Sequence, residues 1–253
     1  METLLSSLTL GFGIGITLGL LGGGGSILTV PALVYLIGLT PQVAVTTSLA
    51  VVGANSALGA VFHHAHGTLN WRVALIFGGT GMFAAYFAAR LSQNFSADVL
   101  MVAFAMLMLV VGLILVFSKT EDAINESHLA MWKIVGSGLI VGVLTGVLGV
   151  GGGFLIVPAL VMLVGLPFHH AIGTSLVIIA MNSAAGFIGH LSGDVLNLSL
   201  ITTFVIAGVA GTYTGARLGN HLDSHYLRRM FAAFVIVLAL FLLYDNVPKL
   251  FLG

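Results

Sequence analysis

Long runs without a charged side chain constrain this sequence more than any other feature. After Glu2 the next Asp, Glu, Lys or Arg is Arg72, so the 69 residues 3–71 carry no charge. A second uncharged run of 60 residues covers 134–193, and only 6% of the whole chain is charged, against roughly 25% in soluble domains. A soluble fold needs charged faces on its helices, whereas a helix that crosses a bilayer needs about 20 apolar residues. The sequence therefore predicts an all-α polytopic membrane protein and excludes the soluble enzyme classes.

The remaining bulk properties exclude several kinds of partner. Lys+Arg and Asp+Glu number eight each, so no basic surplus points to nucleic acid. The absence of cysteine excludes disulfides, thiolate metal sites and iron–sulfur clusters. The first residues carry no positive charge and lead into no soluble domain, which favours a retained first span over a cleaved signal peptide.

The chain repeats itself at an offset of 127 residues. Residues 15–70 match 142–197 without a gap, with 26 identities in 56 positions. Shared apolar composition would not bring the following pairs into one register: Pro31/Pro158, Asn55/Asn182, His63/His190 and Arg90/Arg217. We therefore predict a first transmembrane repeat over 1–117, a polar linker over 118–133 and a second repeat over 134–253.

Each repeat holds five apolar segments, and the second of them is short. The segments lie near 4–22, 27–39, 43–63, 72–90 and 98–117, then near 132–149, 154–166, 171–190, 199–217 and 229–246. Thirteen helical residues span about 20 Å, against a hydrocarbon core about 30 Å thick. Glycine runs favour unwound backbone, and proline is best tolerated at a helix start. We therefore expect breaks over 22–31 and 149–158, with short helices that begin near Pro31 and Pro158.

The distribution of basic residues over the loops favours inverted repeats. If every segment reverses the chain, one side receives six of the eight basic residues and the other receives Arg90 and Lys249; the six are Arg72, Lys119, Lys133, Arg217, Arg228 and Arg229. If the first two segments of each repeat form a single pass, the split is four and four. Cytoplasmic loops are richer in Lys and Arg, so the first arrangement is favoured. An odd number of passes per repeat inverts the halves and places both termini on the outer face.

Inverted repeats with helices broken at matching positions are typical of secondary transporters. Unwound backbone at membrane depth must line a cavity or be buried in protein, and the free N–H groups at a helix start suit an anion. The glycines predicted to bind substrate are Gly22, Gly23, Gly24, Gly25, Gly149, Gly151, Gly152 and Gly153. The alternative is that glycines only let helices pack closely. That alternative is favoured for Gly15, Gly19, Gly142 and Gly146, which are spaced at i, i+4.

The third segment of each repeat carries a matched polar stripe. Its members are spaced by 7, 4 and 4 residues and so share one helical face: Ser48, Asn55, Gly59 and His63, then Ser175, Asn182, Gly186 and His190. Thr47 and Thr174 add hydroxyls beside the serines. Such neutral groups can coordinate a small oxyanion, but Ser, Thr and Asn also form hydrogen bonds between helices. Substrate binding and helix–helix contact both remain open for this stripe.

Histidine and arginine give weaker signals. His63, His64 and His66 resemble a metal cluster, but the second repeat keeps only His190 and no carboxylate is near in sequence, so no metal site is predicted. A gating or coupling role for His63 and His190 stays open. Arg90 and Arg217 follow tyrosines by four residues, which indicates anchoring at the membrane interface or attraction of an anion at opposite mouths. No Asp or Glu is expected deep in a span, which argues against a cation transporter.

These residues carry a family resemblance. The stretch GITLGLLGGGGSILTVPALVYLIG, the TTS with Asn55 downstream and the weaker second copy resemble the TauE/SafE sulfite exporter family, also called the toluene sulfonate uptake permease family. The resemblance covers essentially the whole chain. It implies a prokaryotic inner-membrane protein that moves sulfite, thiosulfate, sulfonates or related sulfur-containing anions. Family members are described with about eight spans, against ten segments here, and Val150 replaces the glycine equivalent to Gly23.

The function expected from the sequence is therefore secondary transport of a small sulfur-containing anion by alternating access. No enzymatic activity, cofactor or nucleic-acid partner is expected; the partners are the anion and the lipid bilayer, and a homodimer is left open. A passive anion channel on the same scaffold is the first alternative. An integral membrane enzyme or assembly factor that uses the histidines is the second.

Overall fold

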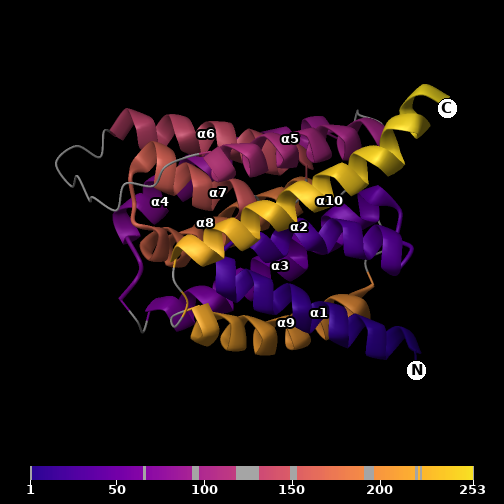
Figure 1. Cartoon of the computed structure of the whole chain (residues 1–253), viewed down its shortest axis with the longest axis horizontal. Helices are drawn as coiled ribbons and strands as arrows, with labels where there is room; N and C mark the ends of the chain where they lie inside the picture. Colours follow the sequence, from indigo (N-terminus) through magenta and orange to yellow (C-terminus); the bar gives the residue numbers. More distant parts are fainter. Residues whose placement is uncertain are drawn as a thin grey trace.

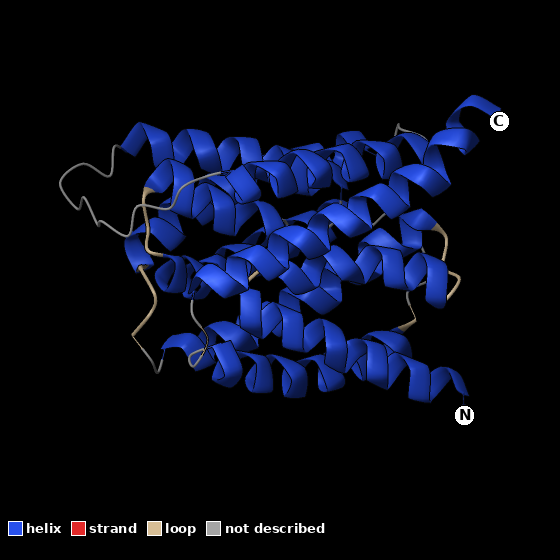
Figure 2. Ribbon diagram, viewed as in Figure 1, coloured by secondary structure: helices blue, strands red, loops and turns tan. Residues whose placement is uncertain are grey.

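A computed structural model describes residues 2–64, 67–92, 97–117, 131–148, 153–190, 197–219, 222 and 224–252. These residues form helices joined by short turns, with no strand among them (Figure 2). The first repeat contains α1 (Glu2–Leu21), α2 (Gly24–Pro31), the π-helical turn η1 (Ala32–Leu36), α3 (Pro41–His64), α4 (Trp71–Ser92) and α5 (Ala97–Phe117). The second contains α6 (Met131–Leu148), α7 (Gly153–Ala159), the π-helical turn η3 (Leu160–Val164), α8 (Phe168–His190), α9 (Leu198–Gly219) and α10 (Ser224–Leu252). The expected all-α class is confirmed.

Several of these helices are suited to a bilayer. Four helical stretches in the described part of the chain are long and apolar enough to cross one: Pro41–His64, Trp71–Leu91, His169–His190 and Leu198–Gly219. Shorter apolar helical stretches accompany them, including Ser6–Leu21 and Val99–Ile114. The chain is therefore a polytopic membrane protein.

The short helices begin earlier than the sequence indicates. In the first repeat only Gly22 and Gly23 leave the helical conformation, and α2 begins at Gly24, so Pro31 ends this helix instead of starting it. In the second repeat α7 begins at Gly153 and contains Pro158. The expectation of helices that begin near the prolines is wrong. Proline has no N–H for an i→i−4 bond, and in both repeats the chain continues beyond it through the wider turn of a π-helix.

Matched glycines end the short helices. Gly38 has φ +81° and Gly165 has φ +83°, a left-handed conformation that glycine adopts without strain. Beyond them the Leu39 N–H donates to the Leu33 carbonyl at 3.0 Å, and the Leu166 N–H donates to the Leu160 carbonyl at 2.9 Å. Each bond joins residues six positions apart, one more than the 6→1 bond of a Schellman cap, in keeping with the wider π-helical turn that precedes it. The two repeats therefore share their turn chemistry as well as their apolar pattern.

The two repeats are interleaved. Helix α1 packs mainly against α9, and its equivalent α6 packs against α4; α5 packs against its own equivalent α10, and α3 against α8 (Figure 1). The contacts of α1 with α9 and of α6 with α4 are made through glycine. Gly15 lies against Gly208 and Gly142 against Gly81, backbone to backbone. The close-packing role expected for Gly15 and Gly142 is confirmed.

Equivalent helices run in opposite directions. Along the contact between α3 and α8, Leu49 faces Gly186, Gly53 faces Ser183 and Gly59 faces Leu176, so the two helices are antiparallel. Helix α1 begins and α10 ends at the same end of the bundle, on the right of Figure 1. Opposite directions of equivalent helices are what inverted repeats require; the orientation in the bilayer and the repeat boundaries near 117 and 134 stay predictions.

Candidate substrate site

The two helix breaks meet inside the bundle. Gly23, the residue before α2, packs against the backbone of Gly153, the first residue of α7. Gly153 also lies against Ile179, which is near the middle of α8. The starts of α2 and α7 therefore contact each other between α1 and α8, at mid-depth of the bundle.

A serine of the polar stripe borders the first break. Gly22, with φ +71°, lies close to the Oγ of Ser175 and to the backbone of Ile172. Ser175 is fully buried and donates to the Ile172 carbonyl at 2.7 Å. Its equivalent Ser48 is equally buried, and its Oγ has no hydrogen-bond partner among the described residues. One predicted substrate serine thus lies beside the break, and the other keeps an unused hydroxyl in the interior.

Asn55 and Asn182 lie in equivalent niches. Each is only 1% exposed. The side-chain amide of Asn55 lies against Gly208 of α9, and that of Asn182 lies against the equivalent Gly81 of α4. Within the described part of the chain, Oδ1 of Asn55 and both polar atoms of Asn182 have no hydrogen-bond partner. Among the described residues, these atoms therefore form no hydrogen bond that would hold α3 or α8 to a neighbouring helix.

Ser56 and Ser183 belong to the same group but were not predicted from the sequence. Both are fully buried, and the described residues offer no partner to either hydroxyl. Ser183 faces Gly53 across the contact of α3 with α8. The signal that could have identified them is their identity at the 127-residue offset, directly after the asparagines.

The other predicted glycines and threonines fall elsewhere. Gly24 and Gly25 are already inside α2, and Gly25 packs on the Ile14 carbonyl and Leu18 of α1. Gly149, Gly151 and Gly152 lie outside the described residues. Thr47 is buried. Thr174 is buried as well and accepts a hydrogen bond from the Asn70 N–H at 3.0 Å, which ties the start of α4 to α8.

The predicted gating residues are distant from the breaks in sequence and lie at helix ends. The Nδ1 of His63 lies 3.2 Å from the Thr68 hydroxyl, and that of His190 lies 3.0 Å from the Gly186 carbonyl. Both histidines are buried at the last position or turn of their helices. His64 is exposed and its ring meets Trp71, whereas His66 lies outside the described residues. Among the described residues no three His, Cys, Asp or Glu side chains come together as a metal site would require.

Arg90 and Arg217 are matched in structure as in sequence. Each is exposed in the last turn of its helix and lies over the ring of the preceding tyrosine, at 4.9 Å from Tyr86 and 4.7 Å from Tyr213. Gly59 of α3 lies against Thr212 of α9, and Gly189 of α8 lies against Tyr86 of α4. With the contacts of Asn55 and Asn182 above, these show that α9 runs parallel to α3 and α4 runs parallel to α8. Because α3 and α8 are antiparallel, Arg90 and Arg217 lie at opposite ends of the bundle.

A polar contact at the end of α10 was missed by the sequence reasoning. The Tyr35 hydroxyl of η1 donates to the Asp245 carboxylate at 2.8 Å and accepts from the Asn246 amide at 2.7 Å. Asp245, near the end of the predicted segment 229–246, lies within α10, which runs on to Leu252, and is partly buried.

The electrostatic character of the site follows from its elements. Helices α2, α3, α7 and α8 all fall within the uncharged runs 3–71 and 134–193. The polar groups that these helices bring to the interior are hydroxyls, amides and backbone, with the histidines at the ends. Such a set binds by hydrogen bonds and dipoles instead of a fixed countercharge.

Comparison with known proteins places the chain in a family of transporters. The family profile "Sulfite exporter TauE/SafE" matches residues 7–242. A "Probable membrane transporter protein" of Xylella fastidiosa strain Temecula1 is 31% identical over 97% of both chains. The probable membrane transporter protein YdhB of Bacillus subtilis is 30% identical over 86% of this chain and 91% of its own. The probable membrane transporter protein MJ0441 of Methanocaldococcus jannaschii is 28% identical over 92% of both.

No solved structure matches the chain significantly. The family match extends from α1 into α10 and so includes both breaks and both asparagines. The chain therefore belongs to the sulfite exporter TauE/SafE family of membrane transporters.

Proposed function

We propose that the protein is a secondary transporter that moves a small sulfur-containing anion, such as sulfite, thiosulfate or an organosulfonate, across a bacterial inner membrane by alternating access. The observation that carries the proposal is the pair of matched, buried Asn–Ser groups with unused polar atoms, on the two helices that pack around the meeting breaks. Buried polar groups are normally hydrogen-bonded. Groups that lack a protein partner in both repeats are available to a ligand.

The anion would be held by neutral donors. The N–H groups of Gly24 and Gly25 begin α2 and have no preceding helical carbonyl to donate to, so they carry partial positive charge; the next N–H, of Ser26, already donates to the Gly23 carbonyl at 3.2 Å. The Asn182 amide and the hydroxyls of Ser48, Ser56 and Ser183 add donors that replace the water lost by the anion. Hydrogen bonds to a charged group contribute about 1.5–3 kcal/mol each, so a few of them offset dehydration without a permanent charge that would hold the anion too tightly.

Alternating access would use the two-fold relation of the repeats. The breaks meet at mid-depth, and α1 with α2 and α6 with α7 form equivalent hairpins around them. Movement of one hairpin with its partner helices would open the site to one side, and the equivalent movement would open it to the other. In this proposal both termini lie on the outer face, and Arg90 and Arg217 stand at opposite mouths.

The test measures binding and flux separately. Purified protein is screened by thermal unfolding against sulfite, thiosulfate, sulfate, sulfonates and carboxylates, because a ligand that binds the folded state raises its unfolding temperature. Asn55→Ala and Asn182→Ala should weaken binding of the stabilising anion roughly ten- to a hundredfold each, as expected for one lost charge-assisted hydrogen bond.

Flux into vesicles distinguishes the transporter from its alternatives. Saturable uptake with counterflow supports alternating access, whereas flux that rises linearly with concentration would establish the passive channel instead. Unchanged binding and unchanged flux in both asparagine variants would remove the site assignment.

A further inference from the structure

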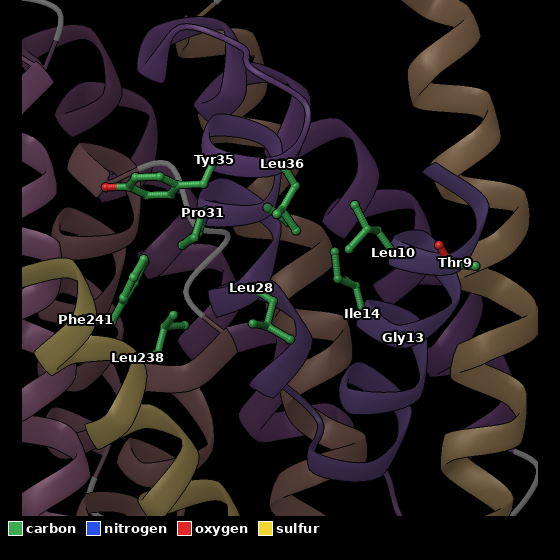
Figure 3. Close-up of a pocket in the computed structure, with 11 residues that line it drawn as sticks. Thr9, Leu10, Gly13, Ile14, Leu28, Pro31, Tyr35, Leu36, Leu238 and Phe241 are labelled. Atoms are coloured by element: carbon green, nitrogen blue, oxygen red, sulfur yellow. The ribbon is translucent and has the colours of Figure 1, made fainter. Parts of the chain in front are cut away.

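An apolar pocket lies on the side of the bundle, away from the polar site. It has a volume of about 330 Å³ and lies between α1, the short helix α2 with η1, and α10 (Figure 3). Leu10 and Ile14 form one wall, Leu238 and Phe241 the opposite wall, and Leu28 and Pro31 the floor. The volume falls within the usual range of ligand sites, about 300–1,000 Å³.

The two polar side chains in the lining are used elsewhere. The Thr9 hydroxyl donates to the carbonyl of Ser6, within its own helix, at 3.0 Å. The Tyr35 hydroxyl points away from the pocket in Figure 3 and is bonded to Asp245 and Asn246. An anionic head group would lose its hydration in this pocket without gaining donors, which is costly. The lining therefore suits a hydrocarbon chain.

The pocket opens onto the outer apolar surface of the bundle. Leu36 and Phe241 of its lining are 65% and 52% exposed. Phe12 of α1 and Val237 and Leu240 of α10 are exposed as well. In a chain that spans a membrane, this surface contacts lipid, so the surrounding medium presents acyl chains to the opening at high concentration.

We propose that this pocket is a binding site for one acyl chain of a bilayer phospholipid. The chain fills the space between α1 and α10 and packs against the outer face of α2, the helix whose start borders the proposed substrate site. The apolar lining offers water no hydrogen-bond partner, and a hydrocarbon chain restores the dispersion contacts that an empty pocket lacks. The proposal does not depend on which substrate the protein moves.

The lack of a side chain at Gly13 leaves room for the pocket, and the second repeat has no glycine at the equivalent position. A side chain at Gly13 would meet no atom within 4 Å. The equivalent position of the second repeat holds Ile140, and the equivalents of Tyr35 and Phe241 are Met162 and Ile114. The acyl-chain site is therefore a feature in which the two repeats differ.

The test uses a photoreactive lipid. The full chain is reconstituted in vesicles of phosphatidylethanolamine and phosphatidylglycerol that contain a fixed trace of phosphatidylcholine with a diazirine in one acyl chain. After illumination, labelled peptides are mapped by mass spectrometry. Label on the peptides that contain Leu10, Leu28 and Leu238 should exceed label near the exposed Phe83 and Phe87 of α4, because a chain held in the pocket stays beside these residues whereas lipid at an open surface exchanges.

Matched leucine variants test the pocket itself. Gly13→Leu places a side chain in the pocket, where its Cβ would meet no atom within 4 Å, and should lower the excess label on the pocket peptides about tenfold, the size of effect that overpacking by one side chain produces. Gly136→Leu makes the same change on the equivalent helix α6, again with no atom within 4 Å, and should leave the label unchanged. Circular dichroism confirms that both variants fold.

Three results would overturn the proposal. The first is pocket label that only equals the label near Phe83 and Phe87 or that persists in Gly13→Leu. The second is loss of label together with crosslinks between two copies at these peptides, which would assign the surface to a dimer. The third is displacement of the label by an alkyl sulfonate but not by an alcohol of equal chain length, which would assign the pocket to the tail of an organic substrate; equal displacement by both supports a chain-only site.

Discussion

Asn55 and Asn182 keep side-chain amides in the interior at a cost to stability. A buried polar atom without a partner costs about 1–3 kcal/mol, and the described residues offer Asn182 no partner for either of its polar atoms. An asparagine retained only for helix association would be bonded across the helix contact. Instead, the neighbouring helix presents a glycine in each case, Gly208 to Asn55 and Gly81 to Asn182. This arrangement favours a ligand as the missing partner.

A leucine at position 182 separates the two roles. Asn182→Leu removes the unpaired polar atoms at similar volume, so without anion the free energy of unfolding should stay the same or rise by up to about 1–3 kcal/mol. The stabilisation caused by the anion should be lost. Thermal unfolding with and without the anion measures both effects.

Thr212→Val is the control for this variant. Thr212 is fully buried and its hydroxyl bonds to the carbonyl of Gly208 within its own helix, so the variant should keep the response to anion. A lower unfolding temperature of Asn182→Leu with an intact response to anion would instead give the asparagine a structural role.

The asparagines were predictable from the sequence, but the adjacent serines were not. A polar residue that recurs at an offset of 127 on one helical face is visible in the sequence alone, as for Ser48 and Asn55. Ser56 and Ser183 fall off that face, and only the crossing of α3 with α8 from the other repeat shows that they are buried without partners. The periodicity of one helix shows which of its residues share a face, but not which residues of the other repeat pack against that face.

At the scale of elements, the sequence indicates that each repeat has a break but not where the break ends. A proline and a glycine run both favour interruption of a helix. The turn itself uses only Gly22 and Gly23. Gly25 lies inside α2, where it allows close packing on the Ile14 carbonyl of α1. The glycines thus serve two purposes that composition does not distinguish.

The contact between the two breaks leads to a prediction for Gly23→Ala. A Cβ at Gly23 would overlap the backbone of Gly153, which cannot move away by a side-chain rotation. Overpacking of this kind costs typically about 1–3 kcal/mol. The variant should therefore unfold at a lower temperature in detergent and lose the response to anion.

Gly79→Ala is the matched control for Gly23→Ala. Gly79 lies in the interior of α4, and a Cβ there would meet no atom within 4 Å. Alanine should therefore raise stability by about 0.5–1 kcal/mol through helix propensity. Equal stability of the two alanine variants would show that the breaks do not meet as described.

At the scale of the whole molecule, interleaving ties the repeats to one another. The main partners of α1, α3 and α5 are α9, α8 and α10, all from the second repeat. A repeat taken alone would expose most of its packed surfaces. The antiparallel run of α3 and α8 further implies that their first residues emerge at opposite ends of the bundle.

The absence of cysteine makes this arrangement testable by single-cysteine labelling. Thr40 is exposed just before α3, and His170 is exposed in the first turn of α8. With inverted repeats and six of eight basic residues on the cytoplasmic side, Thr40→Cys should react with a membrane-impermeant maleimide in intact cells. His170→Cys should react only after permeabilisation. Repeats of parallel orientation would give both cysteines the same accessibility, whereas the reverse pattern would keep the inversion and place both termini in the cytoplasm.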